Sequence, residues 1–121
     1  MTAVRALKLA LLGIALALAG CGHTRVVGAD GTVELSVSEY RLNPQSIRAS
    51  AGVVSIMVHN DGILTHNLVV SANGQDVAST KPIPPGASTE LDLNLAPGKY
   101  LMASTILSDQ TLGAYGTLTV S

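Results

Sequence analysis

The side chains best suited to chemistry in this sequence are thiols and imidazoles, and both are scarce. Cysteine occurs once, as Cys21, and histidine occurs at His23, His59 and His66. A single cysteine excludes an internal disulfide and leaves no thiolate after residue 21. An isolated histidine such as His66 is more often a hydrogen-bonded loop residue than a metal ligand. Residue types alone therefore predict neither a disulfide framework nor a dedicated metal centre.

The beginning of the chain has the pattern of an export signal. Arg5 and Lys8 precede an apolar run from Leu9 to Ala19, which is too short to remain as a membrane anchor. The tetrad Leu18-Ala19-Gly20-Cys21 resembles the lipobox of bacterial lipoproteins, in which the cysteine is lipidated and becomes the first mature residue. This resemblance implies a signal peptide over residues 1–20 and a lipid anchor on Cys21. The alternative is a secreted protein with an incidental cysteine, which an exposed extracellular thiol argues against.

After Cys21 the sequence predicts a tether over residues 21–31 and one domain over residues 32–121. Alternation begins at Thr32, with Val33, Leu35 and Val37 on one face of a half-buried strand. Alternating or β-rich runs return in five later segments: 53–60, 66–72, 88–95, 99–105 and 116–120. Turn residues separate these runs, and Asn73-Gly74 is the best candidate for a tight hairpin.

Many short strands with regular turns predict an all-β domain, an antiparallel Greek-key β-sandwich. Tyr100 follows the Pro97-Gly98 turn at the start of a late strand, as expected for a tyrosine corner. Aromatic residues make up only 2% of the chain, which disfavours stacking platforms for nucleic acid or sugar. A net charge of −1 likewise gives no reason to expect nucleic acid as a partner.

Several segments resemble the cupredoxins, the β-sandwich domains that hold type 1 copper in exported electron-transfer proteins. The resemblance runs from about Val33 to Val120. It rests on "VSEYRLNPQSIRASAGVVSIMVHNDG", "THNLVV", "IPPGASTELDLNLAPGKY" and "GTLTV". In that family copper is held by a histidine at a "H-N" strand start and by a late loop of the form Tyr-x3-Cys-x4-His-x4-Met.

The family's ligand pattern is mostly replaced in this sequence. When the loop is aligned from Tyr100, Ser104 takes the place of the cysteine, Asp109 the second histidine and Ala114 the methionine, while His66-Asn67 matches the "H-N" element. A soft thiolate and two imidazoles suit copper in both oxidation states, and a hydroxyl cannot replace the thiolate. The resemblance therefore implies a retained fold whose type 1 copper site is degenerate at Ser104, Asp109 and Ala114.

Two other chemistries remain open at these positions. His66 and Asp109, with His59 or water, would form a nitrogen and oxygen site for Cu(II) or Zn(II). Ser104, His66 and Asp109 are also the residue types of a hydrolytic triad, although the sequence identifies no oxyanion donors. Copper bound through His66 is thus the alternative cofactor, and no cofactor is the leading expectation.

The sequence favours an exported, membrane-anchored lipoprotein with a cupredoxin-like, non-enzymatic binding or accessory domain. It would sit in a bacterial cell envelope, outside the plasma membrane or in the outer membrane facing the periplasm. The alternative is a periplasmic copper-binding or electron-transfer protein with a remodelled site at His66. In cupredoxins an apolar loop end receives partners, so the resemblance implies an envelope protein docking at Ile63, Leu64, Leu107 and Leu112.

Overall fold

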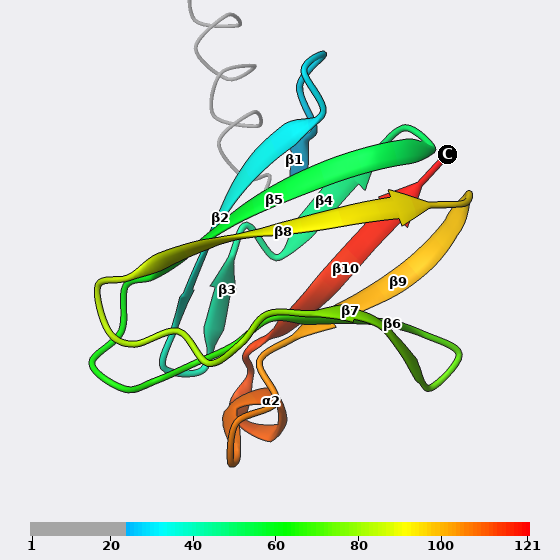
Figure 1. Ribbon diagram of the computed structural model, residues 1–121. Coiled ribbons are helices and arrows are strands. Elements are labelled where there is room, and N and C mark those ends of the chain that lie inside the picture. The colour runs from blue at the N-terminus through cyan, green and yellow to red at the C-terminus, as the bar shows by residue number, and fades with distance from the viewer. Residues whose placement is uncertain (1–23) are drawn as a thin grey trace, which may run out of the picture.

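The computed structural model describes residues 24–121 as a β-sandwich with a short helical turn at one end (Figure 1). The predicted signal peptide, Cys21 and His23 lie outside the described residues, so the predictions made for them stay predictions. Within the described part of the chain, no helix is long and apolar enough to cross a membrane.

Two sheets make up the sandwich. One has the strand order β1-β4-β10-β9-β6-β7 and the other β3-β2-β5-β8. The bounds are β1 Thr24–Val26, β2 Thr32–Ser38, β3 Arg41–Asn43, β4 Ser46–Ala49, β5 Gly52–Asn60, β6 Val69–Ala72, β7 Gln75–Ser79, β8 Ser88–Leu95, β9 Gly98–Ala103 and β10 Tyr115–Val120, with helix α2 at Asp109–Leu112. The prediction of an all-β sandwich is confirmed.

Both sheets are mixed, whereas the sequence pattern predicts antiparallel sheets. β2 pairs with β5, and β4 with both β1 and β10, in parallel. The reason is the path of the chain. After β2 and β3 it crosses to the other sheet as β4 before returning as β5, and such a crossover joins parallel neighbours.

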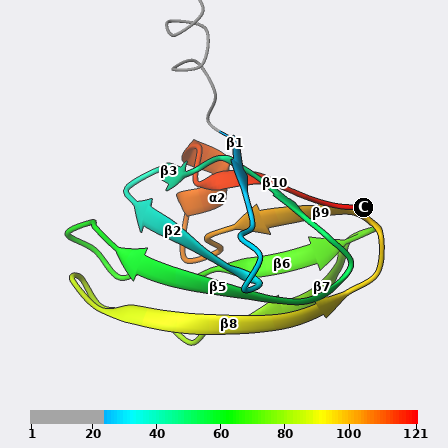
Figure 2. The ribbon, with the colours of Figure 1, turned by 90° about the horizontal axis from the view of Figure 1, so that it is seen from above.

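The core lies between the two sheets and is built by the alternation read from the sequence. Val33, Leu35 and Val37 of β2 are buried, and so are Val54, Ile56 and Val58 of β5. From above, β5 and β8 lie on one side of the molecule and β9 and β10 lie across from them (Figure 2). With few aromatic residues, this core is filled mainly by Val, Leu and Ile side chains.

Some short elements were not predicted. β1 falls inside the expected tether and pairs with β4, so residues 24–26 belong to the folded domain. Three exposed residues carry no alternation that would identify them as a strand. Helix α2 is only four residues long and lies in the loop between β9 and β10.

The two local geometries expected from the sequence are present. Asn73 and Gly74 both have positive φ, 52° and 78°, and connect the antiparallel strands β6 and β7, as a two-residue hairpin turn requires. Tyr100 Oη donates a hydrogen bond of 2.7 Å to the Ala96 carbonyl oxygen, which makes the tyrosine corner.

Candidate functional site at the loop end

His66 is the centre of a polar cluster at one end of the sandwich. Its side chain is completely buried, and its backbone forms an isolated antiparallel bridge with Ile83. His66 N–H donates to the Ile83 carbonyl oxygen at 3.2 Å and its carbonyl oxygen accepts from Ile83 N–H at 2.7 Å. The backbone of His66 is therefore fixed by Ile83 independently of the contacts of its ring.

Both ring nitrogens of His66 face carboxylates. Nδ1 lies 2.6 Å from Asp109 Oδ2, and Nε2 lies 2.5 Å from Glu39 Oε2. The exposed fractions of the side chains are 0% for His66, 7% for Asp109 and 26% for Glu39. A histidine flanked in this way bridges the turn after β2, the β5–β6 loop and the β9–β10 loop.

Glu39 also fixes the loop that leads to His66. Its carboxylate accepts hydrogen bonds from Ile63 N–H at 2.7 Å and Leu64 N–H at 3.4 Å. A Cβ on Gly62 would lie 2.2 Å from Glu39 Oε2, so a side chain at this position would displace the Glu39 carboxylate. Sequence reasoning missed Glu39 because an acidic residue at the end of an alternating strand resembles any solvent-facing side chain.

Ser104 and Asp109 come together as the family alignment implied. Ser104 Oγ donates to Asp109 Oδ2 at 2.7 Å and accepts from Asn67 N–H at 3.2 Å. Ala114 is buried beside them, since its carbonyl oxygen accepts from Ser104 N–H and its N–H donates to the Asp109 carbonyl oxygen. Residues 66, 104, 109 and 114 thus share one site.

The charges in this cluster act on each other's protonation. Burial alone lowers the pKa of His66, but the hydrogen bonds and negative charges of Asp109 and Glu39 outweigh it, so the pKa is raised above its ordinary value. The Ile63 backbone N–H and the His66 ring hold the pKa of Glu39 below its ordinary value. Both shifts favour the charged form of the group concerned.

The residues present do not fit type 1 copper. Ser104 and Ala114 supply neither thiolate nor thioether, and each ring nitrogen of His66 already faces a carboxylate. Asp109 and Glu39 lie on opposite sides of the imidazole, so they cannot converge on one ion. Among residues 24–121, no group of three or more His, Cys, Asp or Glu side chains could hold a metal.

The arrangement also lacks the contacts of a hydrolytic triad. Ser104 donates to Asp109 and not to His66, so the imidazole that acts as the base of a triad does not face the hydroxyl. His59 lies elsewhere, where its Nδ1 is 2.5 Å from Ser88 Oγ and its Nε2 is 3.1 Å from Asp61 Oδ1. His59 therefore does not join His66 and Asp109 in the nitrogen and oxygen site considered above.

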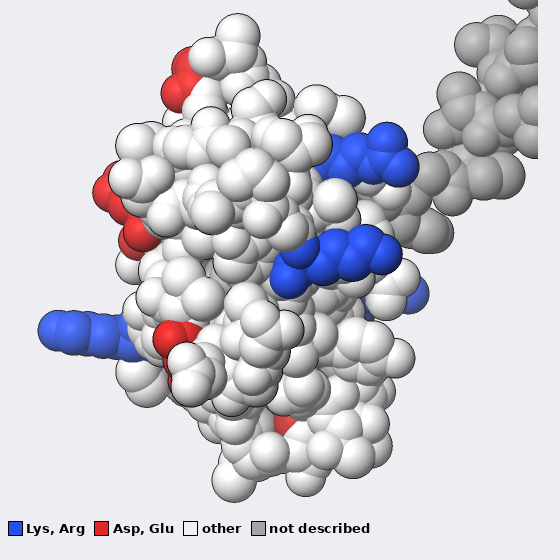
Figure 3. Space-filling model, turned by 90° about the vertical axis from the view of Figure 1, so that its right-hand side faces the viewer, with Lys and Arg blue, Asp and Glu red and all other residues white. Residues whose placement is uncertain are grey.

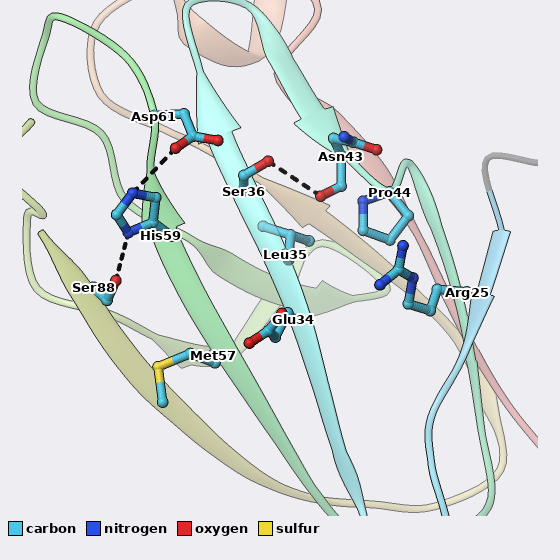
Figure 4. Close-up of a pocket in the computed structure, with 10 residues that line it drawn as sticks. All are labelled: Arg25, Glu34, Leu35, Ser36, Asn43, Pro44, Met57, His59, Asp61 and Ser88. Carbon is cyan, nitrogen blue, oxygen red and sulfur yellow. Dashed lines mark hydrogen bonds and ion pairs between the residues drawn. The ribbon is translucent and has the colours of Figure 1, made fainter. Parts of the chain in front are cut away.

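His59 lines a pocket of about 410 Å³ over β2, β5 and β8 (Figure 4). Met57 lines the same pocket and is 38% exposed, whereas Met102 is buried in the core. A methionine in an apolar strand is usually predicted to fill the core, which is correct for Met102 and wrong for Met57. The pocket lies on the outer face of the sheet, away from the buried cluster around His66.

The four aliphatic residues named as a partner surface are all exposed. We call them the apolar tips: Ile63 is 83% exposed, Leu64 51%, Leu107 94% and Leu112 54%. Ile63 and Leu64 lie in the loop fixed by Glu39, and Leu107 and Leu112 flank Asp109 in the β9–β10 loop. Both loops meet at His66.

A family comparison agrees with the fold. The family model described as the cupredoxin-like domain matches residues 8–120 of this sequence. The chain belongs to this family. No curated protein matches the sequence.

Solved structures with the same fold include several cupredoxin-like domains. Auracyanin from the photosynthetic bacterium Roseiflexus castenholzii has a TM-score of 0.69 and 20% identity, over 78% of this chain and 99% of that chain. Rusticyanin from Thiobacillus ferrooxidans has a TM-score of 0.67 and 15% identity, over 83% of each chain. A multicopper oxidase has a TM-score of 0.61 and 16% identity, and this chain covers 45% of it. At these identities the likeness shows the fold alone.

Proposed function

We propose that this protein is an exported, lipid-anchored cupredoxin-like domain that serves as a non-enzymatic binding or accessory module without type 1 copper. Its place is the bacterial cell envelope, with Cys21 as the membrane attachment and another envelope protein as partner. The observation that carries the proposal is the hydrogen-bonded set of His66, Asp109 and Ser104 at the positions where the family holds copper.

Burial and hydrogen bonding support a structural role for this set. Within the described part of the chain, every buried side-chain nitrogen and oxygen has a hydrogen-bond partner. Metal ligands that must bind an ion would have to give up such partners. The cluster is therefore better suited to holding loops together than to receiving copper.

The apolar tips support the binding role. Exposed aliphatic side chains gathered at one end of a domain are typical of protein contact sites. Charge gives no support for nucleic acid as partner: the net charge is −1, and the face shown in Figure 3 carries both acidic and basic side chains among wide uncharged areas.

The test of the copper-free proposal is a copper titration of the full-length protein in detergent, under oxidising and then reducing conditions. Cys21→Ser is the background, because a free thiol would bind Cu(I). Visible absorption, electron paramagnetic resonance and calorimetry should show no tight stoichiometric binding. Tight binding that is lost in His66→Ala and kept in His59→Ala would refute the proposal and favour a remodelled copper or electron-transfer site at His66.

The partner role is tested by substitution at the apolar tips. Leu64→Asp and Leu112→Asp should each remove the same envelope proteins from a crosslinked pull-down without changing the unfolding midpoint. Val53→Asp is the matched control, since Val53 is 70% exposed and lies near the other end of β5. Unchanged capture by both tip variants would exclude docking at this end.

The membrane attachment is tested by labelling cells with a clickable palmitate analogue. The wild-type chain should carry the label and sediment with membranes, whereas Cys21→Ser should do neither. Label retained by Cys21→Ser would overturn the anchor.

A further inference from the structure

The contacts of the two ring nitrogens of His66 determine how many protons His66 and the two carboxylates beside it must hold. A neutral imidazole has one N–H, which donates, and one bare nitrogen, which accepts. In this structure both nitrogens lie within 2.6 Å of a carboxylate oxygen, Asp109 Oδ2 on one side and Glu39 Oε2 on the other. A bare nitrogen facing an ionised carboxylate would bring two lone pairs together. At least one proton beyond the neutral imidazole must therefore be shared by this group.

The other contacts of the carboxylates show where that proton belongs. Glu39 accepts from the N–H groups of Ile63 and Leu64, and donors of this kind stabilise an ionised carboxylate. Ser104 Oγ lies 2.7 Å from Asp109 Oδ2 and 3.3 Å from Asn67 Oδ1, and the shorter contact places the Ser104 proton on the side of Asp109. Both carboxylates are thus placed as acceptors, and His66 is the group left to carry the charge.

We propose that the loop end is a proton-binding site, in which a proton on His66 is the resident cation held between Asp109 and Glu39 where the family holds copper. Each N–H of the imidazolium donates to one carboxylate, and charge-assisted bonds of this kind are stronger than neutral ones. The proposal deepens the copper-free function proposed above and rests on it.

The charged groups facing His66 are limited to this pair in the described residues. Glu39 comes from the turn after β2 and Asp109 from the β9–β10 loop, while Ile83 contributes only backbone. A protonated His66 between two carboxylates leaves the group with one net negative charge. The hydrogen-bond donors of Ile63, Leu64 and Ser104 help to stabilise that charge. The direction of the His66 pKa shift agrees with this arrangement.

The contacts of His66 with Asp109 and Glu39 also affect the position of the apolar tips. Glu39 binds the backbone of Ile63 and Leu64, and Asp109 begins helix α2, which ends at Leu112. His66 joins these two carboxylates, so a proton on His66 positions both loops that carry the tips. A surface ordered in advance loses less conformational entropy when a partner binds.

Nitrogen NMR of the uniformly labelled full-length protein at about pH 7 tests the site, because an unperturbed histidine is mostly neutral there. The ring nitrogens of His66 are assigned by correlation to its own backbone, so no variant is needed. Both should be protonated, each with a slowly exchanging N–H, and Asp109→Asn and Glu39→Gln should each shift the nitrogen that faces them. One protonated and one bare nitrogen in the wild type would overturn the proposal. The solvent-facing His59 serves as the reference in the same spectrum.

Copper added to the same sample separates this inference from the proposed function. Two protonated nitrogens that persist with copper present support both. A neutral His66 in a protein that binds no copper overturns the inference and leaves the copper-free module standing. Loss of the His66 N–H signals on stoichiometric copper binding overturns both.

Discussion

Two regions of this domain contain the same residue types and differ in their surroundings. In both, a histidine contacts an aspartate: His66 with Asp109 at the loop end, and His59 with Asp61 on the outer face of the sheet. The histidine side chain is 0% exposed in the first region and 44% in the second. Each region also contains a serine, but Ser104 donates to the aspartate whereas Ser88 contacts the histidine.

The difference between the two regions shows that composition does not define a site. Water screens the exposed pair at His59, and such pairs contribute little to stability. At His66 the charges are removed from water, so each depends on its partner, and loss of one partner leaves the other buried and uncompensated. Only the buried region ties several loops together, which is why it matters for the surface that carries the apolar tips.

The largest difference between the two regions is expected when each is given the residue types of a copper site. Ser104→Cys combined with Asp109→His places a thiolate near two imidazoles, the donor set of trigonal copper sites. In a Cys21→Ser background this variant should bind Cu(II) stoichiometrically and turn blue, as measured by visible absorption and electron paramagnetic resonance. The wild type should remain colourless.

The matched variant is Ser88→Cys with Asp61→His around His59, which supplies the same donor types on the surface. It should bind copper weakly and without blue colour, because no loop frame holds the ligands. A folded loop-end variant that stays colourless would mean that the spacing from residue 100 to 114 no longer places ligands around one ion.

The next largest effect is on stability when the aspartates are removed. Asp109→Ala leaves the buried His66 without its Nδ1 partner, and we expect unfolding free energy to fall by about 3 to 5 kcal/mol. Asp61→Ala should change it by at most about 1 kcal/mol, since that pair is exposed. Urea unfolding of both variants measures the contrast. Equal losses would show that burial does not distinguish the two regions.

The sequence predicts the sandwich better than its sheet topology. Alternation at Val33, Leu35 and Val37 predicts a half-buried strand, because the period of side chains along a strand is a local property. The parallel pairing of β2 with β5 is not local, since it depends on the chain crossing to the other sheet in between. The three residues of β1 carry no pattern and are placed only by pairing with β4.

The site is predictable only in part. The resemblance to cupredoxins places His66, Ser104 and Asp109 together, and the structure confirms that they meet. Glu39 could not be found in this way, because its role depends on the β5–β6 loop folding back so that the N–H groups of Ile63 and Leu64 reach its carboxylate. His59 shows another limit of the sequence. Like His66 it contacts an aspartate, but the sequence does not reveal that the side chain of His59 is exposed.

A smaller effect is expected at the serines. Ser104→Ala removes a hydrogen bond to a carboxylate in a buried place, which should cost about 1.5 to 3 kcal/mol. Ser88→Ala on the surface should cost no more than about 0.5 kcal/mol. The same unfolding measurement applies to both, with Ser104→Thr as a check that retains the hydroxyl. A loss below that of Ser88→Ala would mean that Asp109 does not depend on Ser104.

The smallest and most specific effect is the pH dependence of stability. The pKa of His66 is raised above 6.5 in the fold, so its stabilisation is complete below pH 6.5 and is lost as pH rises through the folded value. The pKa of Glu39 is lowered below 4.5, so its stabilisation is present above pH 4.5 and is lost as pH falls through the folded value. The contacts of His66 with Asp109 and Glu39 should therefore stabilise the fold most between pH 4.5 and pH 6.5.

Urea unfolding across pH 4 to 9, compared among wild type, His66→Gln and His59→Gln, measures this window. The stability difference between wild type and His66→Gln should shrink as pH rises above 6.5, because the native wild type binds a proton that the unfolded chain has released. His59→Gln should keep the alkaline limb of the wild type, since the buried bridge is intact in that variant. If His59→Gln removed the limb and His66→Gln kept it, the exposed histidine would be the group that couples protons to folding, and the contrast between the two regions would be reversed.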